Sequence, residues 1–249
     1  MSMRFLPGSL LIEGTLSEPY RILAASGAYR LVMALRRESS GGALGVVYFA
    51  FDQGEELVLW DSPSVLMSDG SSPEGVQTHA LALGPMYREA DGCWLPLAGL
   101  PTPWYDVTLE VEQETGETLA WSVIWKIYGG PIVREAIALS ATGLEYVANL
   151  QWTIPGFRLQ MPLPLMDTPI VPQIRGSTLS LRSNVWTMMA EAQDADSVWR
   201  LEAWTLPGQP RPANIHGSGY LRAVLQSSQA VQYRLCVKVL PAEPEKRGS

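Results

Sequence analysis

The residues that most often perform chemistry near neutral pH are few in this sequence. Histidine, the commonest metal ligand and acid–base group in this range, occurs only as His79 and His216. His79 alternates in phase with Leu81 and Leu83, which favours a core or interface position. His216 lies in a loop rich in turn-forming residues, where functional side chains are common. Two histidines and two cysteines at no ligand-like spacing predict no metal site.

Motifs for nucleophilic and nucleotide chemistry are also missing. The sequence holds no Gly-x-Ser-x-Gly elbow, no P-loop and no Gly-x-Gly-x-x-Gly turn, and it predicts no cofactor. Glu110 and Glu112 face the same side of one predicted strand as Asp106, as paired carboxylates of a glycosidase could. The same pattern is typical of a solvated outer face, which we favour. Cys93, beside a turn, and Cys236, on a strand, are interpreted as unconnected thiols that are buried or half-buried.

The segment from Tyr105 to Ile127 predicts a β-hairpin. Its apolar residues alternate with polar ones on both sides of a short loop, Glu114-Thr115-Gly116, in which glycine supplies a left-handed residue. We therefore expect one buried face and one solvated face. The buried face should carry Tyr105 and Trp121, and the solvated face Glu110, Glu112 and Lys126.

Short strand-like runs recur along the whole chain and are separated by turn signals such as Asp52-Gln53-Gly54 and Thr142-Gly143. Helices should be few and short, because no long segment shows a 3.6-residue period with caps. The predicted fold class is all-β: an antiparallel sandwich or jelly-roll-like barrel with long proline-rich crossover loops. The expected strands are 9–16, 28–37, 43–52, 55–61, 76–83, the hairpin, 132–140, 144–154, 177–182, 185–192, 198–205, 219–226 and 231–240.

Two proline-rich stretches interrupt this rhythm, at 95–104 and at about 155–176. Proline cannot donate a hydrogen bond to a sheet, so we expect neither to form a central strand. The second stretch is apolar, and we interpret it as an arm that packs on protein, preferably on a neighbouring subunit. Residues 1–241 are then one composite domain and 242–249 a charged C-terminal tail. The predicted interface residues of the arm are Phe157, Leu163, Leu165 and Met166.

Charge and hydropathy limit the partners. The formal net charge is −7 and the chain has only 17% charged residues. The arginines are dispersed, which argues against nucleic acid as a partner because its phosphates require clustered cations. No apolar run approaches the roughly 20 residues that span a bilayer. The first residues lack a secretion signal, so we expect synthesis in the cytoplasm, with incorporation into a particle as one outcome.

Nine tryptophans are scattered along the chain, and most are expected in the core. Trp94 and Trp104 lie beside loops and are the best candidates for binding sugar.

The features together favour a non-enzymatic assembly subunit, such as a viral or phage-like coat, tail or fibre protein, that forms a homo-oligomer or binds other assembly subunits. A fold analogy alone does not establish such a function. The first alternative is a β-barrel carrier, or an isomerase or cyclase, for an apolar small molecule, in which His216, Tyr220 and Asp106 would act. The second alternative is a carbohydrate-binding β-sandwich that uses Trp94 and Trp104.

Overall fold

The hairpin predicted from alternation is present in the computed structural model of the chain. β8 (Tyr105–Gln113) pairs with β9 (Thr118–Ile127) in antiparallel fashion, opposite residues being Tyr105 and Ile127. The predicted facing is confirmed, because alternate residues of β9 are buried and those between them are mostly more exposed. The buried side chains include Tyr105, Trp121 and Trp125, and the exposed ones Glu110, Glu112 and Lys126.

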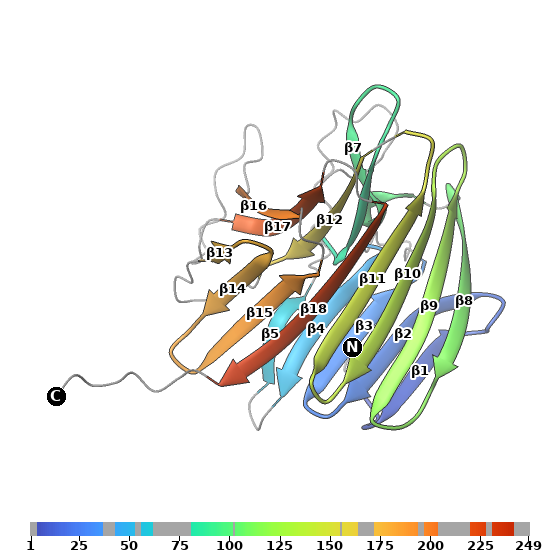
Figure 1. Cartoon of the computed structure of the whole chain (residues 1–249). Coiled ribbons are helices and arrows are strands. Elements are labelled where there is room, and N and C mark those ends of the chain that lie inside the picture. Colours follow the sequence, from blue (N-terminus) through green and yellow to red (C-terminus); the bar gives the residue numbers. More distant parts are fainter. Residues whose placement is uncertain are drawn as a thin grey trace, which may run out of the picture.

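The structure describes residues 4–36, 43–52, 56–61, 81–101, 103–154, 156–163, 172–193, 197–203, 220–227 and 231–241. These residues form three antiparallel sheets (Figure 1). Their one helical element is the 3₁₀ turn η1 (Leu97–Gly99). The all-β antiparallel sandwich predicted from the sequence is therefore confirmed. No helix in this described part has the length and apolar character to cross a membrane.

The first sheet, here called the N-terminal sheet, is a simple meander in which each strand pairs with the next along the chain. Its second strand is not among the predicted ones. It begins at Pro19 and is joined to the third strand by a two-residue turn at Gly27, whose φ is 53°. The strands are β1 (Ser9–Gly14), β2 (Pro19–Ser26), β3 (Tyr29–Ala34), β4 (Gly45–Asp52) and β5 (Glu56–Asp61).

The eight-stranded sheet contains β8 and β9 and is the largest layer. Its strand order is β13-β14-β15-β18-β11-β10-β9-β8, so the last strand of the chain lies in the middle. This strand, β18, corresponds to the strand predicted at 231–240. The remaining strands are β10 (Ile132–Ser140), β11 (Gly143–Gln151), β13 (Gln173–Arg175), β14 (Thr178–Arg182), β15 (Trp186–Ala192) and β18 (Gln232–Pro241).

The third sheet collects strands from distant parts of the chain in the order β16-β17-β12-β6-β7. It lies at the top of the molecule in Figure 1. The strands are β6 (Gly84–Arg88), β7 (Trp94–Pro96), β12 (Phe157–Pro162), β16 (Val198–Ala203) and β17 (Tyr220–Ser227).

The prediction that the stretch at 155–176 contains no central strand is wrong. β12 lies between β17 and β6 and pairs with both. The prolines do not interrupt it, because Pro155 precedes the strand and Pro162 is its last residue. Phe157 and Leu163, predicted at a subunit interface, are buried in the core of the chain itself. Leu165 and Met166 lie outside the described residues.

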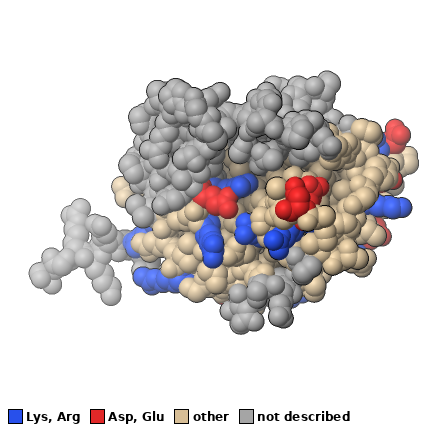
Figure 2. Space-filling model, turned by 90° about the horizontal axis from the view of Figure 1, so that it is seen from above, with Lys and Arg blue, Asp and Glu red and all other residues tan. Residues whose placement is uncertain are grey.

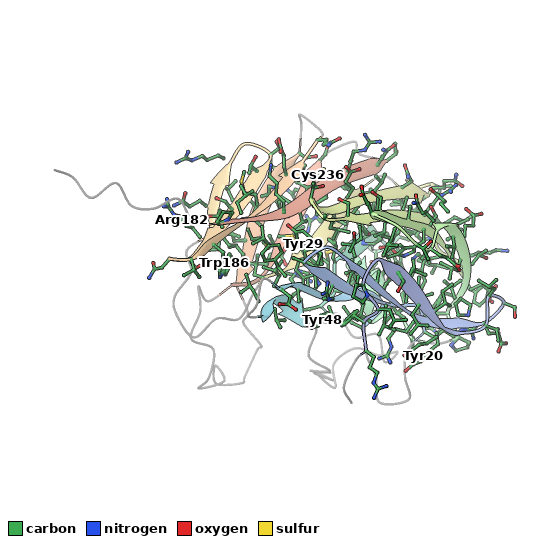
Figure 3. All side chains as sticks on the ribbon, turned by 90° about the horizontal axis from the view of Figure 1, so that it is seen from below. Tyr20, Tyr29, Tyr48, Arg182, Trp186 and Cys236 are labelled. Carbon is green, nitrogen blue, oxygen red and sulfur yellow. The ribbon has the colours of Figure 1, made fainter. Side chains whose placement is uncertain are left out.

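One hydrophobic core draws side chains from all three sheets. Two buried tyrosines connect the layers by hydrogen bonds. The Tyr29 hydroxyl of β3 accepts the backbone N–H of Val239 in β18, at 2.9 Å, between the N-terminal and eight-stranded sheets (Figure 3). The Tyr233 hydroxyl of β18 donates to the carbonyl of Phe157 in β12, at 2.8 Å. The eight-stranded sheet is therefore bonded to both of the others.

One carboxyl group lies on the buried face of β10. Glu135 alternates with the core residues Val133 and Ile137 and has no exposed surface. The indole N–H of Trp125 in β9 and the hydroxyl of Tyr146 in β11 each donate a hydrogen bond to one of its oxygens. Burial raises the pKa of Glu135 to about 7, and the two hydrogen bonds oppose the rise.

The buried hairpin face predicts unequal costs of truncation. Trp121→Ala should lower the free energy of unfolding by about 3 to 5 kcal/mol, because it opens a cavity beside fully buried neighbours. Glu112→Ala, on the exposed face, should cost less than about 0.5 kcal/mol. Urea denaturation of both variants measures the difference. Equal losses of unfolding free energy would contradict the assignment of Trp121 to the buried face and Glu112 to the exposed face.

Glu135 predicts that stability depends on pH in a particular direction. Because its pKa is about 7 in the folded chain and 4.5 ordinarily, the folded state binds an extra proton between these pH values. The free energy of unfolding should fall by roughly 3 kcal/mol from this group as the pH rises through that interval. Glu135→Gln cannot titrate, and its amide can accept from Trp125 and donate to Tyr146. Denaturant unfolding measures the free energy of unfolding between about pH 4.5 and 7.5. This free energy should depend less on pH in the variant than in the parent chain. An unchanged pH dependence would show that Glu135 is not its source.

Candidate functional site

An aromatic cleft of about 470 Å³ lies at one end of the sandwich. This volume is within the range of small-molecule sites. Strand ends from two sheets meet there: the start of β8, the β9–β10 turn, the segment after β11 and the β6–β7 turn, at the upper end in Figure 1. The lining comprises Tyr87, Glu89, Ala90, Asp91, Trp104, Ile127, Tyr128, Gly129, Gly130, Trp152, Thr153 and Ile154.

Trp104 and Tyr128 are held together by their backbones. The N–H of Tyr128 donates to the carbonyl of Trp104 at 2.9 Å, and the N–H of Trp104 donates to that of Pro101 at 3.0 Å. Gly129 completes the turn with a φ of 70°, a left-handed conformation that favours glycine. The side chain of Tyr128 is 55% exposed. A hydrogen bond with the Asp106 carboxylate raises the pKa of Tyr128, so its hydroxyl stays protonated near neutral pH.

Trp152 fixes the opposite side of the cleft to the β6–β7 turn. Its indole N–H donates to the backbone carbonyl of Arg88, at 3.0 Å. The turn is closed by two backbone bonds, from Glu89 N–H to the carbonyl of Cys93 at 2.9 Å and from Gly92 N–H to the carbonyl of Glu89 at 3.0 Å. The cleft therefore has a defined shape, because its parts are bonded to strand ends.

Asp91 and Cys93 form a local polar pair at the rim. The Asp91 carboxylate accepts the backbone N–H of Cys93 at 2.8 Å, and this bond lowers the pKa of Asp91. A second hydrogen bond, between the Cys93 thiol and the Asp91 carboxylate, and the negative charge of Asp91 raise the pKa of the Cys93 thiol. Cys93 is thus kept protonated and is a poor nucleophile near neutral pH. Cys93 and Cys236 are both free thiols, as predicted, but only Cys236 is half-buried, whereas Cys93 is exposed because it lies in the β6–β7 turn.

The lining combines aromatic surface with acceptor oxygens. Trp104, Trp152 and Tyr128 offer flat apolar rings, while Glu89 and Asp91 bring negative charge. No Lys or Arg is among the described residues that line the cleft. Such a site can pack the C–H face of a sugar ring and accept hydrogen bonds from its hydroxyl groups. It would repel a ligand that carries negative charge at this position.

The structure brings together only part of the residues proposed from the sequence. Trp104 lines the cleft, whereas Trp94 lies in β7 on the neighbouring third sheet and is not part of the lining. Asp106 is exposed on β8 and reaches the cleft only through Tyr128. His216 and the side chain of Tyr220 lie outside the described residues, so the grouping of these two with Asp106 stays a prediction.

Trp152 and Tyr128 were not singled out from the sequence. Tyr128 follows the predicted strand that ends at Ile127, and Trp152 lies near the end of the predicted strand 144–154 but just after the observed β11. A position at a strand end is the one signal that could have found them. Their proximity depends on the pairing of β9, β10 and β11, which places the β9–β10 turn beside the end of β11.

The rest of the described chain offers less for chemistry. A second cleft, of about 530 Å³, lies on β13, β14, β15 and β18 of the eight-stranded sheet, but its described lining holds no aromatic side chain. Among the described residues, no group of three His, Cys, Asp or Glu side chains could hold a metal ion. The aromatic cleft is therefore the candidate site.

Solved structures with a similar fold come from much longer chains. No protein-family model matches this sequence, and no curated protein does. A heparinase III with methylated lysines matches 95% of this chain with a TM-score of 0.62 and 10% identity. The heparan sulfate lyase HepC from Pedobacter heparinus matches 94% with a TM-score of 0.57 and 9% identity. This chain spans 36% and 37% of those two chains, so the shared part is an all-β sandwich within a larger protein.

The Asp91–Cys93 pair predicts a change in thiol reactivity. Asp91→Asn removes the negative charge that raises the pKa of Cys93, so the thiolate fraction and the rate of alkylation should increase. We expect iodoacetamide to modify Cys93 about threefold faster or more at pH near 8. Mass spectrometry measures the rate, with Cys236 as the internal reference. Equal rates in the variant and the parent chain would contradict the pairing.

Proposed function

We propose that this chain is a carbohydrate-binding β-sandwich that holds a neutral sugar in the aromatic cleft. The observation that carries the proposal is that Trp104, Trp152 and Tyr128 line one cleft together with two carboxylates. Sugar rings have one apolar face and a rim of hydroxyl groups, and this lining complements both. The proposal concerns binding and assigns no catalytic step to the cleft.

The charge of the lining supports a neutral ligand. Glu89 and Asp91 are on the wall, and the Asp106 carboxylate is bonded to Tyr128 beside it. A uronate or a sulfate placed between these groups would meet like charge, and no Lys or Arg is among the described lining residues. Hydroxyl groups, in contrast, can donate to the carboxylates.

The similar structures agree with a role in carbohydrate recognition. The names heparinase III and heparan sulfate lyase describe proteins that act on polysaccharide. The structures of these proteins contain a sandwich of this fold. At about 10% identity the likeness concerns the fold. We infer that a sandwich of this kind can serve a polysaccharide-active protein as a module, and the cleft is the reason to apply this to the present chain.

The other hypotheses from the sequence have less support. The coat, tail or fibre hypothesis relied on an exposed apolar arm, but Phe157 and Leu163 are buried within the chain. The comparisons give that hypothesis no support. The barrel hypothesis required closure, whereas the described strands form three sheets with open edges.

Binding of neutral oligosaccharides tests the proposal. Trp104→Ala and Trp152→Ala should each weaken the affinity for a bound oligosaccharide at least about tenfold, the equivalent of roughly 1.4 kcal/mol. Tyr20→Ala, a half-buried aromatic residue of β2 outside the cleft, should leave the affinity within about twofold. Titration calorimetry against a panel of neutral hexasaccharides of differing linkage measures these values.

Two results would contradict the proposal. One is that no member of the panel binds the parent chain. The other is that a bound member binds both tryptophan variants as tightly as the parent chain. Thermal unfolding of each variant checks that the sandwich is intact, because Trp152 also supports the β6–β7 turn.

A further inference from the structure

Four arginines gather on the outer face of the third sheet, opposite the core. Arg88, Arg158, Arg222 and Arg200 lie on β6, β12, β17 and β16. Their alignment follows from the strand register. Arg158 pairs with Met86 and Gln226, Arg222 with Pro162, and Arg200 with Val224, which are all outward positions. In the sequence these arginines are dispersed, so only the pairing of distant strands shows the cluster.

Most of this positive charge has no negative partner among the described residues. Glu202 is the acidic side chain of the described part of β16, and Arg222 occupies it with two nitrogens of its guanidinium, both at 2.6 Å. Arg222 also donates to the amide oxygen of the buried Gln160, at 2.9 Å. Neither Arg158 nor Arg200 forms an ion pair within the described part of the chain. Figure 2 shows Lys or Arg and Asp or Glu side chains together at the centre of this upper face.

Trp94 holds Arg158 in place. The guanidinium carbon of Arg158 lies 4.0 Å from the centre of the Trp94 ring. A Cβ atom at Gly156 would lie only 3.1 Å from the same ring, so the absence of a side chain there lets Trp94 lie across β12. Stacking fixes the plane of the guanidinium and leaves its N–H edge free to bind two oxygens of one oxyanion.

Placing these arginines close together does not stabilise the folded chain. Arg158 is half-buried; burial lowers its pKa, as do the nearby charges of Arg200 and Arg222, while Glu202 opposes them. The chain has a net charge of −7, with 25 acidic residues, yet no further carboxylate is placed beside Arg158 within the described part. Uncompensated like charges on a structured surface are typical of a site that a ligand neutralises.

We propose that Arg158, Arg200 and Trp94 form an oxyanion site that binds the carboxylate or sulfate groups of an acidic glycan. The ligand class rests on the proposed carbohydrate-binding function. A polysaccharide has the length to reach this face and the cleft together, since both adjoin the β6–β7 hairpin: Trp94 pairs with Arg88, whose carbonyl accepts the bond from Trp152 of the cleft. Neutral sugar units then occupy the cleft, and charged units the arginine site.

Charge-removing variants test the site on the intact chain. The probes are sulfated maltohexaose, an oligogalacturonate of similar length, unsulfated maltohexaose, sodium sulfate and single-stranded DNA. Arg158→Gln and Arg200→Gln should each weaken binding of an anionic oligosaccharide about tenfold at low salt and reduce the salt dependence of log Kd by about one unit. Arg234→Gln, an exposed arginine on β18 of another sheet, should change the affinity less than about twofold. Trp94→Ala keeps every charge but should weaken binding about threefold or more, because the guanidinium is no longer held.

The outcomes separate this site from the cleft. If an anionic oligosaccharide binds the Arg158→Gln and Arg234→Gln variants with the same affinity, the arginine site is refuted. The cleft can still bind neutral sugar in that case. If neutral binding fails but anionic binding depends on Arg158, the cleft proposal fails and the arginine site stands. Failure of the parent chain to bind either anionic oligosaccharide, binding of inorganic sulfate as tightly as of sulfated maltohexaose, or equal binding of single-stranded DNA would each overturn the acidic-glycan assignment.

Discussion

Both five-stranded sheets depend on the buried face of the eight-stranded sheet. That face presents large side chains from every second residue of its central strands, and one continuous core joins it to the other two sheets. Tyr29 and Tyr233 add hydrogen bonds across the two contacts. A shift of one residue in β18 would turn its buried side chains to solvent and remove both bonds. The register of the eight-stranded sheet is therefore the main constraint on the whole sandwich.

The same sheet explains where the buried carboxyl group and the cleft lie. Glu135 sits between diagonal neighbours on the two adjoining strands, Trp125 and Tyr146, so its hydrogen bonds form only in this register. The cleft lies where β9, β10 and β11 end and meet the β6–β7 turn. Side chains at strand ends are exposed enough to bind a ligand, while the core below keeps their backbones in place. The fold thus provides a rigid support for a shallow aromatic site.

Strict alternation made some of the fold predictable and left other parts hidden. The hairpin of β8 and β9 and the strand at 232–241 follow from apolar residues at every second position. β12 was missed because Pro155 and Pro162 suggested an interrupted segment, although Pro155 precedes the strand in the sequence and Pro162 is its last residue, so the residues between them pair with both neighbours. Glu135 could have been noticed as a carboxyl group in phase with Val133 and Ile137. Its hydrogen-bond partners could not, since they depend on strand pairing.

The candidate site shows the same limit. Trp104 was identified from its position beside a loop, but Trp152 and Tyr128 join it only because the pairing of β8, β9, β10 and β11 brings their strand ends to the same edge. The arginines of the third sheet are a stronger case. Arg88, Arg158, Arg200 and Arg222 give no basic run in the sequence, and four strands must pair before they share a face. Local patterns report which face a residue occupies, whereas sites built from several strands depend on long-range register.

The central claim is that the aromatic cleft is the place where sugar binds. Nuclear magnetic resonance of the tryptophan indole N–H groups tests it most directly, because the nine tryptophans report on different parts of the chain. During titration with a neutral oligosaccharide, the indole signals of Trp104 and Trp152 should move, while those of the core residues Trp121 and Trp125 stay in place. Saturable binding with the Trp104 and Trp152 signals unmoved would contradict the account.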